Sequence, residues 1–310
     1  MTKIIWIDGG IGRVITSIPA LLKYHQNNLN EEWYIMIPSW DYVTWGFPEL
    51  QERTFDPDMK GSFDLCWKAD QVMTPEPYRV PAYYRNEISL KEAFDVALNN
   101  STDHSDLPPM QLRLSVAEKR AGLDIIEKVK KEQKKKKTIV LQPYGGAANP
   151  HPSGPYDDTL RSIPKPMLDY FVDNLSKDYN LIFMGAKDFH KYYSKTFKPA
   201  PDPSLRNWMG IINAADYFIG CDSCGQHICK SLNKKASVVI AGTHRNNITY
   251  DDFHIIERDI PFYSSAMRLS NLQSNLSSRL NEPRIEFTSD EIEDAYQDII
   301  KNIGKELSYS

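Results

Sequence analysis

Short apolar segments alternate with helical patterns through the second half of this chain, and no other feature constrains its fold as strongly. Each apolar segment has the length of a buried strand, and the apolar spacing between segments fits single helices. The predicted strands are 138–142, 180–184, 217–221, 237–241 and 253–257, with helices at 166–178, 204–215 and 225–233. Strands and helices in this order form a parallel sheet covered by helices. We therefore expect a doubly wound α/β domain here.

The beginning of the chain has the same organisation on a smaller scale. A strand at 3–7 enters a glycine-rich turn, a helical pattern follows, and 33–37 is a second strand. Pro19 lies inside the helical pattern and should kink or shorten that helix, because proline removes a backbone hydrogen bond. Two strands joined by a helix are expected to be parallel. We thus predict two Rossmann-like α/β domains, with the functional site in a cleft between them.

The stretch from 40 to 113 is rich in aromatic residues and proline but has little periodicity. It is expected to form satellite core, or a surface that stacks on rings or sugars, and Phe63–Trp67 is one more possible strand. A lysine-rich segment at 128–137 is typical of a solvated helix end that leads into a linker, with a nucleic-acid patch as the alternative. We place the domain boundary there.

The predicted domains are therefore 1–130 and 131–287, followed by a terminal helix at 288–310. This last helix has a capping-box pattern from Thr288 to Glu291, and its apolar stripe is expected to pack at the domain junction.

The composition excludes several classes of protein. Among 310 residues the formal net charge is -4, so no general field attracts nucleic acid or an anionic membrane. No apolar run is long enough to cross a membrane, and the first residues lack the pattern of a signal peptide. Four cysteines do not make a disulfide scaffold. We expect a cytoplasmic protein.

Ligands of doubly wound sheets bind beyond the carboxyl ends of the strands, so the turns there are the candidate sites. The first turn contains Asp8, Gly9, Gly10, Gly12 and Arg13. Its glycine spacing differs from the dinucleotide fingerprint. The second turn contains Asp222, Ser223, Cys224, Gly225 and His227, and a third at 241–245 would lie beside it. Helix amides in these turns could hold a phosphate. The alternatives are a tight turn without ligand, and a helix cap followed by a buried histidine.

Two short patterns suggest a metal or redox centre. Cys221 and Cys224 have the C-x-x-C spacing, but a zinc site would also need His227 and Cys229, which a strand followed by a helix spreads apart. The segment 56–58 imitates the D-x-D pair of metal-dependent sugar transferases in only three residues. The sequence has neither a nucleophile elbow nor a P-loop.

Several segments together resemble the heptosyltransferase-type glycosyltransferases of family 9. They are GGIGRVITSIPALLKYH (9–25), IVLQPYGG (139–146), RSIP (161–164), IFMGAKD (182–188) and INAADYFIGCDSCGQHICKSLNKKASVVIAGT (212–243). The last is the most specific, because Asp222, Ser223 and His227 are similar to the family's D-[ST]-G-x-x-H turn. The resemblance implies the GT-B architecture, with an acceptor-binding domain followed by a nucleotide-sugar-binding domain.

The resemblance also implies an activity. It is the inverting transfer of a sugar from a nucleotide-sugar to a hydroxyl of an unidentified glycan, lipid-linked or other acceptor, with no metal and no further cofactor. The implied donor and phosphate contacts are Gly9, Gly10, Gly12, Arg13, Arg161, Asp188, Asp222, Ser223, Gly225, His227, Gly242 and Thr243.

Two positions depart from the family. Arg13 stands where the family has its catalytic aspartate, and a guanidinium cannot act as a base near neutral pH. Asp8 is the only carboxylate on this turn, so it is the predicted catalytic base. Cys224 stands where the family has glycine, with Gly225 one position later. The alternatives are a catalytically inactive protein that binds a nucleotide or glycan, and a glucosyltransferase that modifies DNA.

Overall fold

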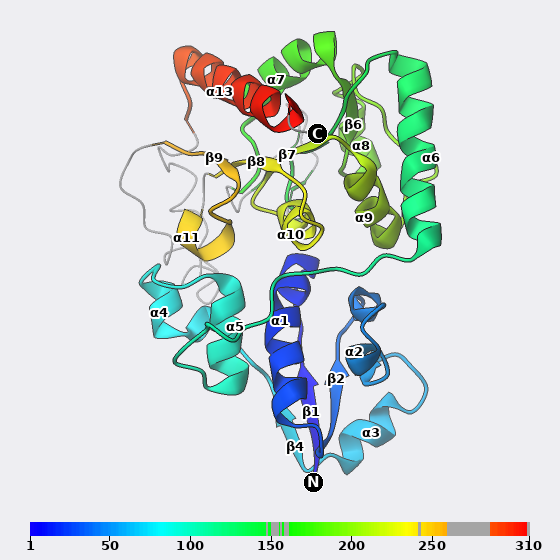
Figure 1. Ribbon diagram of the computed structural model, residues 1–310, viewed down its shortest axis with the longest axis vertical. Coiled ribbons are helices and arrows are strands. Elements are labelled where there is room, and N and C mark those ends of the chain that lie inside the picture. Colours follow the sequence, from blue (N-terminus) through cyan, green and yellow to red (C-terminus); the bar gives the residue numbers. More distant parts are fainter. Residues whose placement is uncertain are drawn as a thin grey trace. The chain divides into compact units, whose positions relative to one another are not determined.

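The computed structural model describes residues 1–146, 148–149, 155, 157, 161–240, 243–258 and 286–308. The chain divides into two compact units, Met1–Ser115 and Val116–Ser310. Each unit is built on a parallel sheet with helices beside it (Figure 1). The predicted α/β fold class is therefore confirmed.

The sheet of the first unit has the strand order β3-β2-β1-β4. Its strands are β1 (Thr2–Trp6), β2 (Glu32–Met36), β3 (Thr54–Phe55) and β4 (Gln71–Met73). Helix α1 (Ile11–Asn27) connects the parallel strands β1 and β2, as predicted. Pro19 does not shorten α1, because the residues around it are buried in the core and hold the helix together.

The stretch after β2 forms several short helices. They are η1 (Asp41–Thr44), α2 (Pro48–Gln51), α3 (Ser62–Lys68), η2 (Pro77–Arg79), α4 (Pro81–Tyr84) and α5 (Leu90–Asn99). The strand predicted at Phe63–Trp67 is wrong, because these residues lie in α3. Phe63 and Trp67 are one helical turn apart there, and their exposed rings stack with centroids 6.2 Å apart. Other aromatic side chains of the stretch, including Phe47 and Phe94, are fully buried and extend the core.

The sheet of the second unit has the order β6-β5-β7-β8-β9, and all its pairings are parallel. The strands are β5 (Thr138–Gln142), β6 (Asn180–Phe183), β7 (Tyr217–Cys221), β8 (Ala236–Val239) and β9 (His254–Ile256). The helices are α6 (Val116–Gln133), α7 (Lys165–Asp178), α8 (Lys187–His190), α9 (Leu205–Ala214), α10 (Cys224–Ser231), α11 (Arg245–Ile248) and α13 (Ser289–Ser308). All five predicted strands are present.

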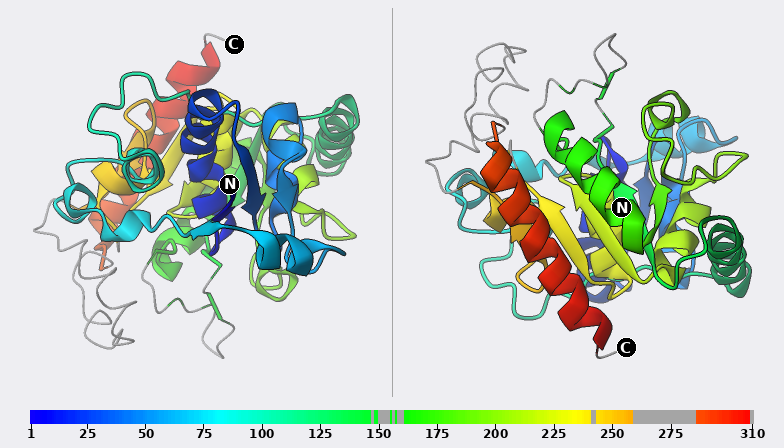
Figure 2. Two further views of the ribbon diagram at one scale, coloured as in Figure 1. Left: turned by 90° about the horizontal axis from the view of Figure 1, so that it is seen from below. Right: turned by 90° about the horizontal axis from the view of Figure 1, so that it is seen from above.

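Helices α7 and α13 lie side by side against one face of this sheet (Figure 2). Ile299 and Ile303 of α13 and Phe171 of α7 are fully buried in the shared core. The predicted capping box opens α13: the Thr288 amide donates to Glu291, and the Glu291 amide donates to the Thr288 hydroxyl. The sequence thus predicts this helix and its start correctly, and within the second unit the apolar stripe packs on the core of the sheet.

Helix α6 packs on α9, within the second unit. A Cβ on Gly122 would lie 2.0 Å from the carbonyl oxygen of Gly210, so the two helices cross where neither has a side chain. The largely buried ion pair between Glu118 and Arg206, with Nε to Oε1 at 2.6 Å, joins the same helices. The unit boundary accordingly precedes α6, whereas the boundary predicted at residue 130 falls within that helix.

Among the helices that the structure describes, none is both long enough and apolar enough to cross a membrane.

Candidate functional site

The turn between β7 and α10 is organised by a buried carboxylate. Asp222 is 4% exposed and directly follows β7. Its Oδ2 accepts a hydrogen bond of 2.9 Å from the Thr243 hydroxyl. Its Oδ1 accepts one of 3.3 Å from the side-chain amide Nε2 of Gln226. Asp222 therefore ties the carboxyl end of β7 to the turn that follows β8. Thr243 is buried as well, so two of the predicted residues are brought into direct contact.

Gln142, the last residue of β5, completes this turn from the neighbouring strand. Its Oε1 accepts from the Gly225 amide at 2.8 Å, and its Nε2 donates to the Ser223 hydroxyl at 3.2 Å. A Cβ on Gly225 would lie 2.2 Å from that Oε1, so any other residue would displace the Gln142 side chain. Ser223 is the N-cap residue of α10, but its side chain makes no capping hydrogen bond. Sequence reasoning missed Gln142. The signal that could have found it is a polar residue at the end of a buried strand, where ligands of such sheets bind.

His227 lies in the first turns of α10 and is 5% exposed. Burial lowers its pKa to about 4; the charge of Asp222 opposes this shift, and the positive charge of Arg161 adds to it. The imidazole is therefore neutral at neutral pH. Its Nδ1 lies 2.8 Å from the hydroxyl of Tyr250, a residue that no sequence motif indicated. Burial raises the pKa of Tyr250, so its hydroxyl keeps its proton.

Arg161 approaches the site from the turn after β5. The Ser162 hydroxyl accepts from the Gly145 amide at 3.0 Å and donates to Asp157 at 2.5 Å, which holds Asp157 and Ser162 against that turn. A Cβ on Gly145 would lie 3.9 Å from Nη2 of Arg161. The positive charge of Arg161 lies near enough to contribute to the lowered pKa of His227.

Two predicted donor contacts stand apart from this cluster. Asp188 is exposed in the first turn of α8, which follows β6 on the far side of β5 from β7. Gly242 lies outside the described residues.

The predicted glycine-rich turn of the first unit lies between β1 and α1. Gly9 has a φ of +92°, which favours glycine, and Gly10 is the N-cap residue of α1. Gly12 lies in the first turn of α1, and its carbonyl accepts from the Thr16 hydroxyl. The three glycines therefore shape the entry into α1.

Arg13 is enclosed on this turn, with its side chain only 11% exposed. Its Nη1 donates to Glu76 at 3.2 Å, and its Nη2 lies 3.2 Å from both the Pro75 carbonyl and Asp8 Oδ1. Tyr78 lies against the guanidinium. The Asp8 side chain is 64% exposed, so the predicted base remains accessible while the charge of Arg13 is paired. Glu76, which the sequence analysis missed, follows β4 next to β1 at the same sheet edge.

The metal-like patterns have other roles in this structure. Cys221 and Cys224 are free thiols, and burial raises the pKa of both. Asp56 accepts hydrogen bonds from the amides of Ser39 and Asp58, as a turn residue does. In the described part of the chain, no three His, Cys, Asp or Glu side chains are grouped to hold a metal ion.

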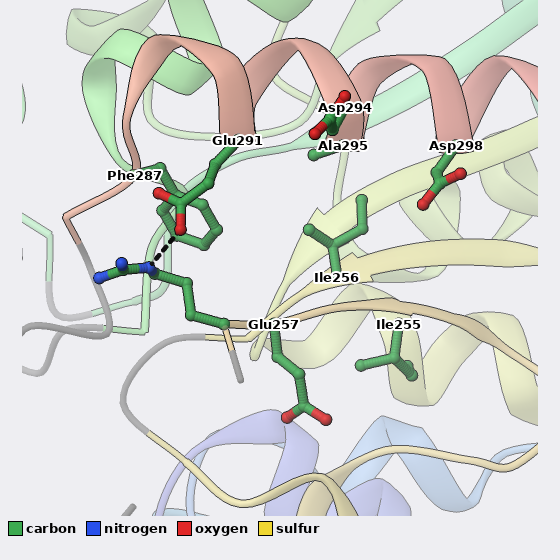
Figure 3. Close-up of a pocket in the computed structure, with 9 residues that line it drawn as sticks. Ile255, Ile256, Glu257, Phe287, Glu291, Asp294, Ala295 and Asp298 are labelled. Atoms are coloured by element: carbon green, nitrogen blue, oxygen red, sulfur yellow. Dashed lines mark hydrogen bonds and ion pairs between the residues drawn. The ribbon is translucent and has the colours of Figure 1, made fainter. Parts of the chain in front are cut away.

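A cavity of about 250 Å³ lies between β9 and α13 (Figure 3). Ile255 and Ile256 line it from β9 and Ala295 lines it from α13, and an ion pair joins Arg258 after β9 to Glu291 of α13. Of the predicted site residues that the structure describes, none lines this cavity.

Comparison with known proteins adds information at the level of the fold. No family model and no curated protein sequence matches the chain. Solved structures match it over most of its length at 10 to 12% identity. ADP-heptose LPS heptosyltransferase II of E. coli is 12% identical, with a TM-score of 0.60 over 90% of this chain and 100% of that one.

Two further structures are equally similar. A family 9 glycosyltransferase of Veillonella parvula is 10% identical, with a TM-score of 0.65 over 98% of this chain and 97% of that one. The iron-containing dodecameric glycosyltransferase TibC of enterotoxigenic E. coli is 10% identical, with a TM-score of 0.63 over 100% of this chain and 80% of that one; it has also been solved with ADP-D-β-D-heptose. The chain therefore has the fold of the heptosyltransferase-type family 9 glycosyltransferases, as the sequence resemblance implied.

Proposed function

We propose that this chain is a glycosyltransferase that moves a sugar from a nucleotide-sugar donor to an acceptor hydroxyl with inversion and without a metal. The observation that carries the proposal is the braced turn of Asp222–His227 at the carboxyl edge of a parallel sheet. It occurs in a fold shared with enzymes of this class. One of these, TibC, has been solved with a nucleotide-sugar.

The donor diphosphate would lie against the first turn of α10. The amino end of a helix carries partial positive charge and suits an anion. Ser223, His227 and Arg161 would supply donors, while Asp222 is bonded to Thr243 and would hold the turn in shape. Gly242 and the exposed Asp188 complete the proposed donor contacts. In this structure the Gly225 amide donates to Gln142 and is not available to a phosphate. Gly225 would support the site because it has no side chain to collide with Gln142.

Asp8 would be the catalytic base of the first unit. Its exposed carboxylate would take the proton of the acceptor hydroxyl while the hydroxyl oxygen attacks the anomeric carbon. The bond from that carbon to the nucleoside diphosphate breaks, and the donor site would stabilise the charge on the leaving group. Gly9, Gly10 and Gly12 would allow close approach of the backbone. Direct displacement by one nucleophile inverts the anomeric centre.

One observation favours a second candidate, a protein that binds a nucleotide or glycan without transfer. Arg13 stands at the position of the family's catalytic aspartate, and it is enclosed by protein groups rather than open to a substrate.

Calorimetric titration with nucleoside diphosphates and nucleotide-sugars, with and without a chelator, tests the donor site. We expect one nucleotide to bind equally in both conditions, and Arg161→Gln to weaken it. Arg120→Gln is the matched control, because Arg120 is 74% exposed on α6 and pairs only with Asp124 among the described residues. If no nucleotide binds, the proposal is wrong. Transfer and hydrolysis assays of Asp8→Asn then distinguish an enzyme from a binding protein.

A further inference from the structure

His227 and Tyr250 form a pair that neither the fold nor the family pattern requires. His227 belongs to α10, whereas Tyr250 follows α11, so the contact joins two elements beside the proposed donor site. The hydroxyl oxygen lies 2.8 Å from Nδ1, and the rings are perpendicular with centroids 5.9 Å apart. The distance is that of a hydrogen bond, and the ring contact keeps the two side chains in this relative orientation.

Tyr250 is itself held in place from two sides. The ammonium group of Lys230 lies 5.5 Å from the centre of the Tyr250 ring, and Lys230 is fixed by an ion pair of 2.7 Å with Asp252. Phe253 packs edge-on against the same ring at 5.3 Å. The phenol is therefore oriented before any ligand binds.

The chemistry of the two groups favours the phenol as the donor of this hydrogen bond. A neutral imidazole nitrogen is a strong acceptor, and a tyrosine hydroxyl is a better donor than acceptor toward it. The nitrogen that accepts a hydrogen bond cannot also carry the ring proton, so the proton of neutral His227 is on Nε2. Nε2 has no hydrogen-bond partner among the described residues, and it is not one of the fully enclosed unpaired atoms.

We propose that Tyr250 is a positioning residue that fixes His227 in the tautomer with hydrogen on Nε2, so that a neutral histidine donates to an oxygen of the bound diphosphate. The identity of that anion rests on the proposed function, whereas the tautomer does not. In the other tautomer, Nε2 would turn a lone pair toward the anion and repel it. Tyr250 thus determines whether Nε2 of His227 donates a hydrogen bond to the phosphate or presents a lone pair to it.

The tautomer can be measured without any ligand by nitrogen NMR of the histidine side chains at neutral pH, with His227→Asn to assign the signal. We expect a protonated Nε2 and an unprotonated Nδ1 in the wild-type protein. Tyr250→Phe keeps the ring and removes the hydroxyl, so the His227 signal should change to that of a tautomer mixture. A proton on Nδ1 in the wild-type protein would overturn the proposal.

Titration with ADP measures the consequence for binding. We expect Tyr250→Phe to weaken ADP about twofold or more, because the apparent Kd rises in inverse proportion to the fraction of His227 that carries hydrogen on Nε2. Tyr192→Phe is the matched control, because Tyr192 is an exposed tyrosine next to α8 and should leave ADP affinity unchanged. An altered tautomer with unchanged ADP affinity would contradict the positioning role. If no nucleotide binds while the tautomer changes as expected, it is the proposed function that fails.

Discussion

Acid should destabilise the second unit through His227. The pKa of this side chain is about 4 in the folded chain, against an ordinary value of 6.5. Below pH 6.5 the unfolded chain takes up a proton on this residue and the folded chain does not. The stabilisation is therefore complete above pH 6.5 and is lost as the pH falls from 6.5 through 4. At 1.36 kcal/mol per unit of pKa, the total is about 3 kcal/mol.

His227→Asn isolates this contribution. Asparagine is uncharged at every pH, and its amide oxygen can accept from Tyr250 near the place of Nδ1. Urea unfolding should be measured for both proteins near pH 7.5 and near pH 4.5. Between these conditions, the wild-type protein should lose about 2 to 3 kcal/mol more unfolding free energy than the variant.

Other titrating groups cancel in this comparison. Burial also lowers the pKa of His254, but His254 is present in both proteins. An equal loss in the wild-type protein and in His227→Asn would show that burial does not keep this histidine neutral. The argument for the Nε2 tautomer would then lose its basis, because a charged imidazole carries hydrogen on both nitrogens.

Three further predictions follow from single contacts. Gly122→Ala puts a Cβ 2.0 Å from a backbone oxygen of α9 and should cost about 3 kcal/mol or more in urea unfolding, because backbone cannot move aside as a side chain can. Thr243→Val removes a hydrogen bond to the buried Asp222, so calorimetry should show about 1 to 3 kcal/mol less stability and weaker nucleotide binding. Burial acts to raise the pKa of Asp95, but its hydrogen bonds from His104, Asn99 and Lys23 outweigh burial and lower it. Asp95→Asn should therefore cost about 3 kcal/mol at neutral pH and progressively less as the pH falls through the carboxylate range, followed by thermal unfolding.

Periodicity predicted the elements of the second unit because its strands are buried on both faces. The strand at 138–142 has three consecutive apolar residues at its centre, all five of its residues are buried, and its predicted bounds are those of β5. Capping chemistry is equally local, so the start of α13, directly after Thr288, could be predicted from four residues. The error at Phe63–Trp67 arises from the same rule, since a short apolar run has no period and fits a strand or a helix equally well.

The missed site residues share a different property. Gln142, Tyr250 and Glu76 each contact a predicted residue from 23 to 83 positions away in the sequence. Such contacts depend on the strand order of the sheet, which the pattern of a single segment does not contain. The unit boundary was displaced for a similar reason. The lysine run near the end of α6 suggested a linker, whereas the glycine contact with α9 determines where the helix packs.

Because of the contacts around Arg13, the variant Asp8→Asn can distinguish a glycosyltransferase from a protein that only binds its ligand. Nη1 of Arg13 donates to Glu76 and Nη2 donates to the Pro75 carbonyl. The guanidinium therefore keeps these two partners when Asp8 is replaced. Asp8 itself is mostly exposed and makes one contact with Arg13. Asp8→Asn should therefore leave the turn folded, and a loss of transfer would report on proton removal from the acceptor. Substitution of Arg13 has no such clarity, because it would remove the cation that pairs with both Asp8 and Glu76.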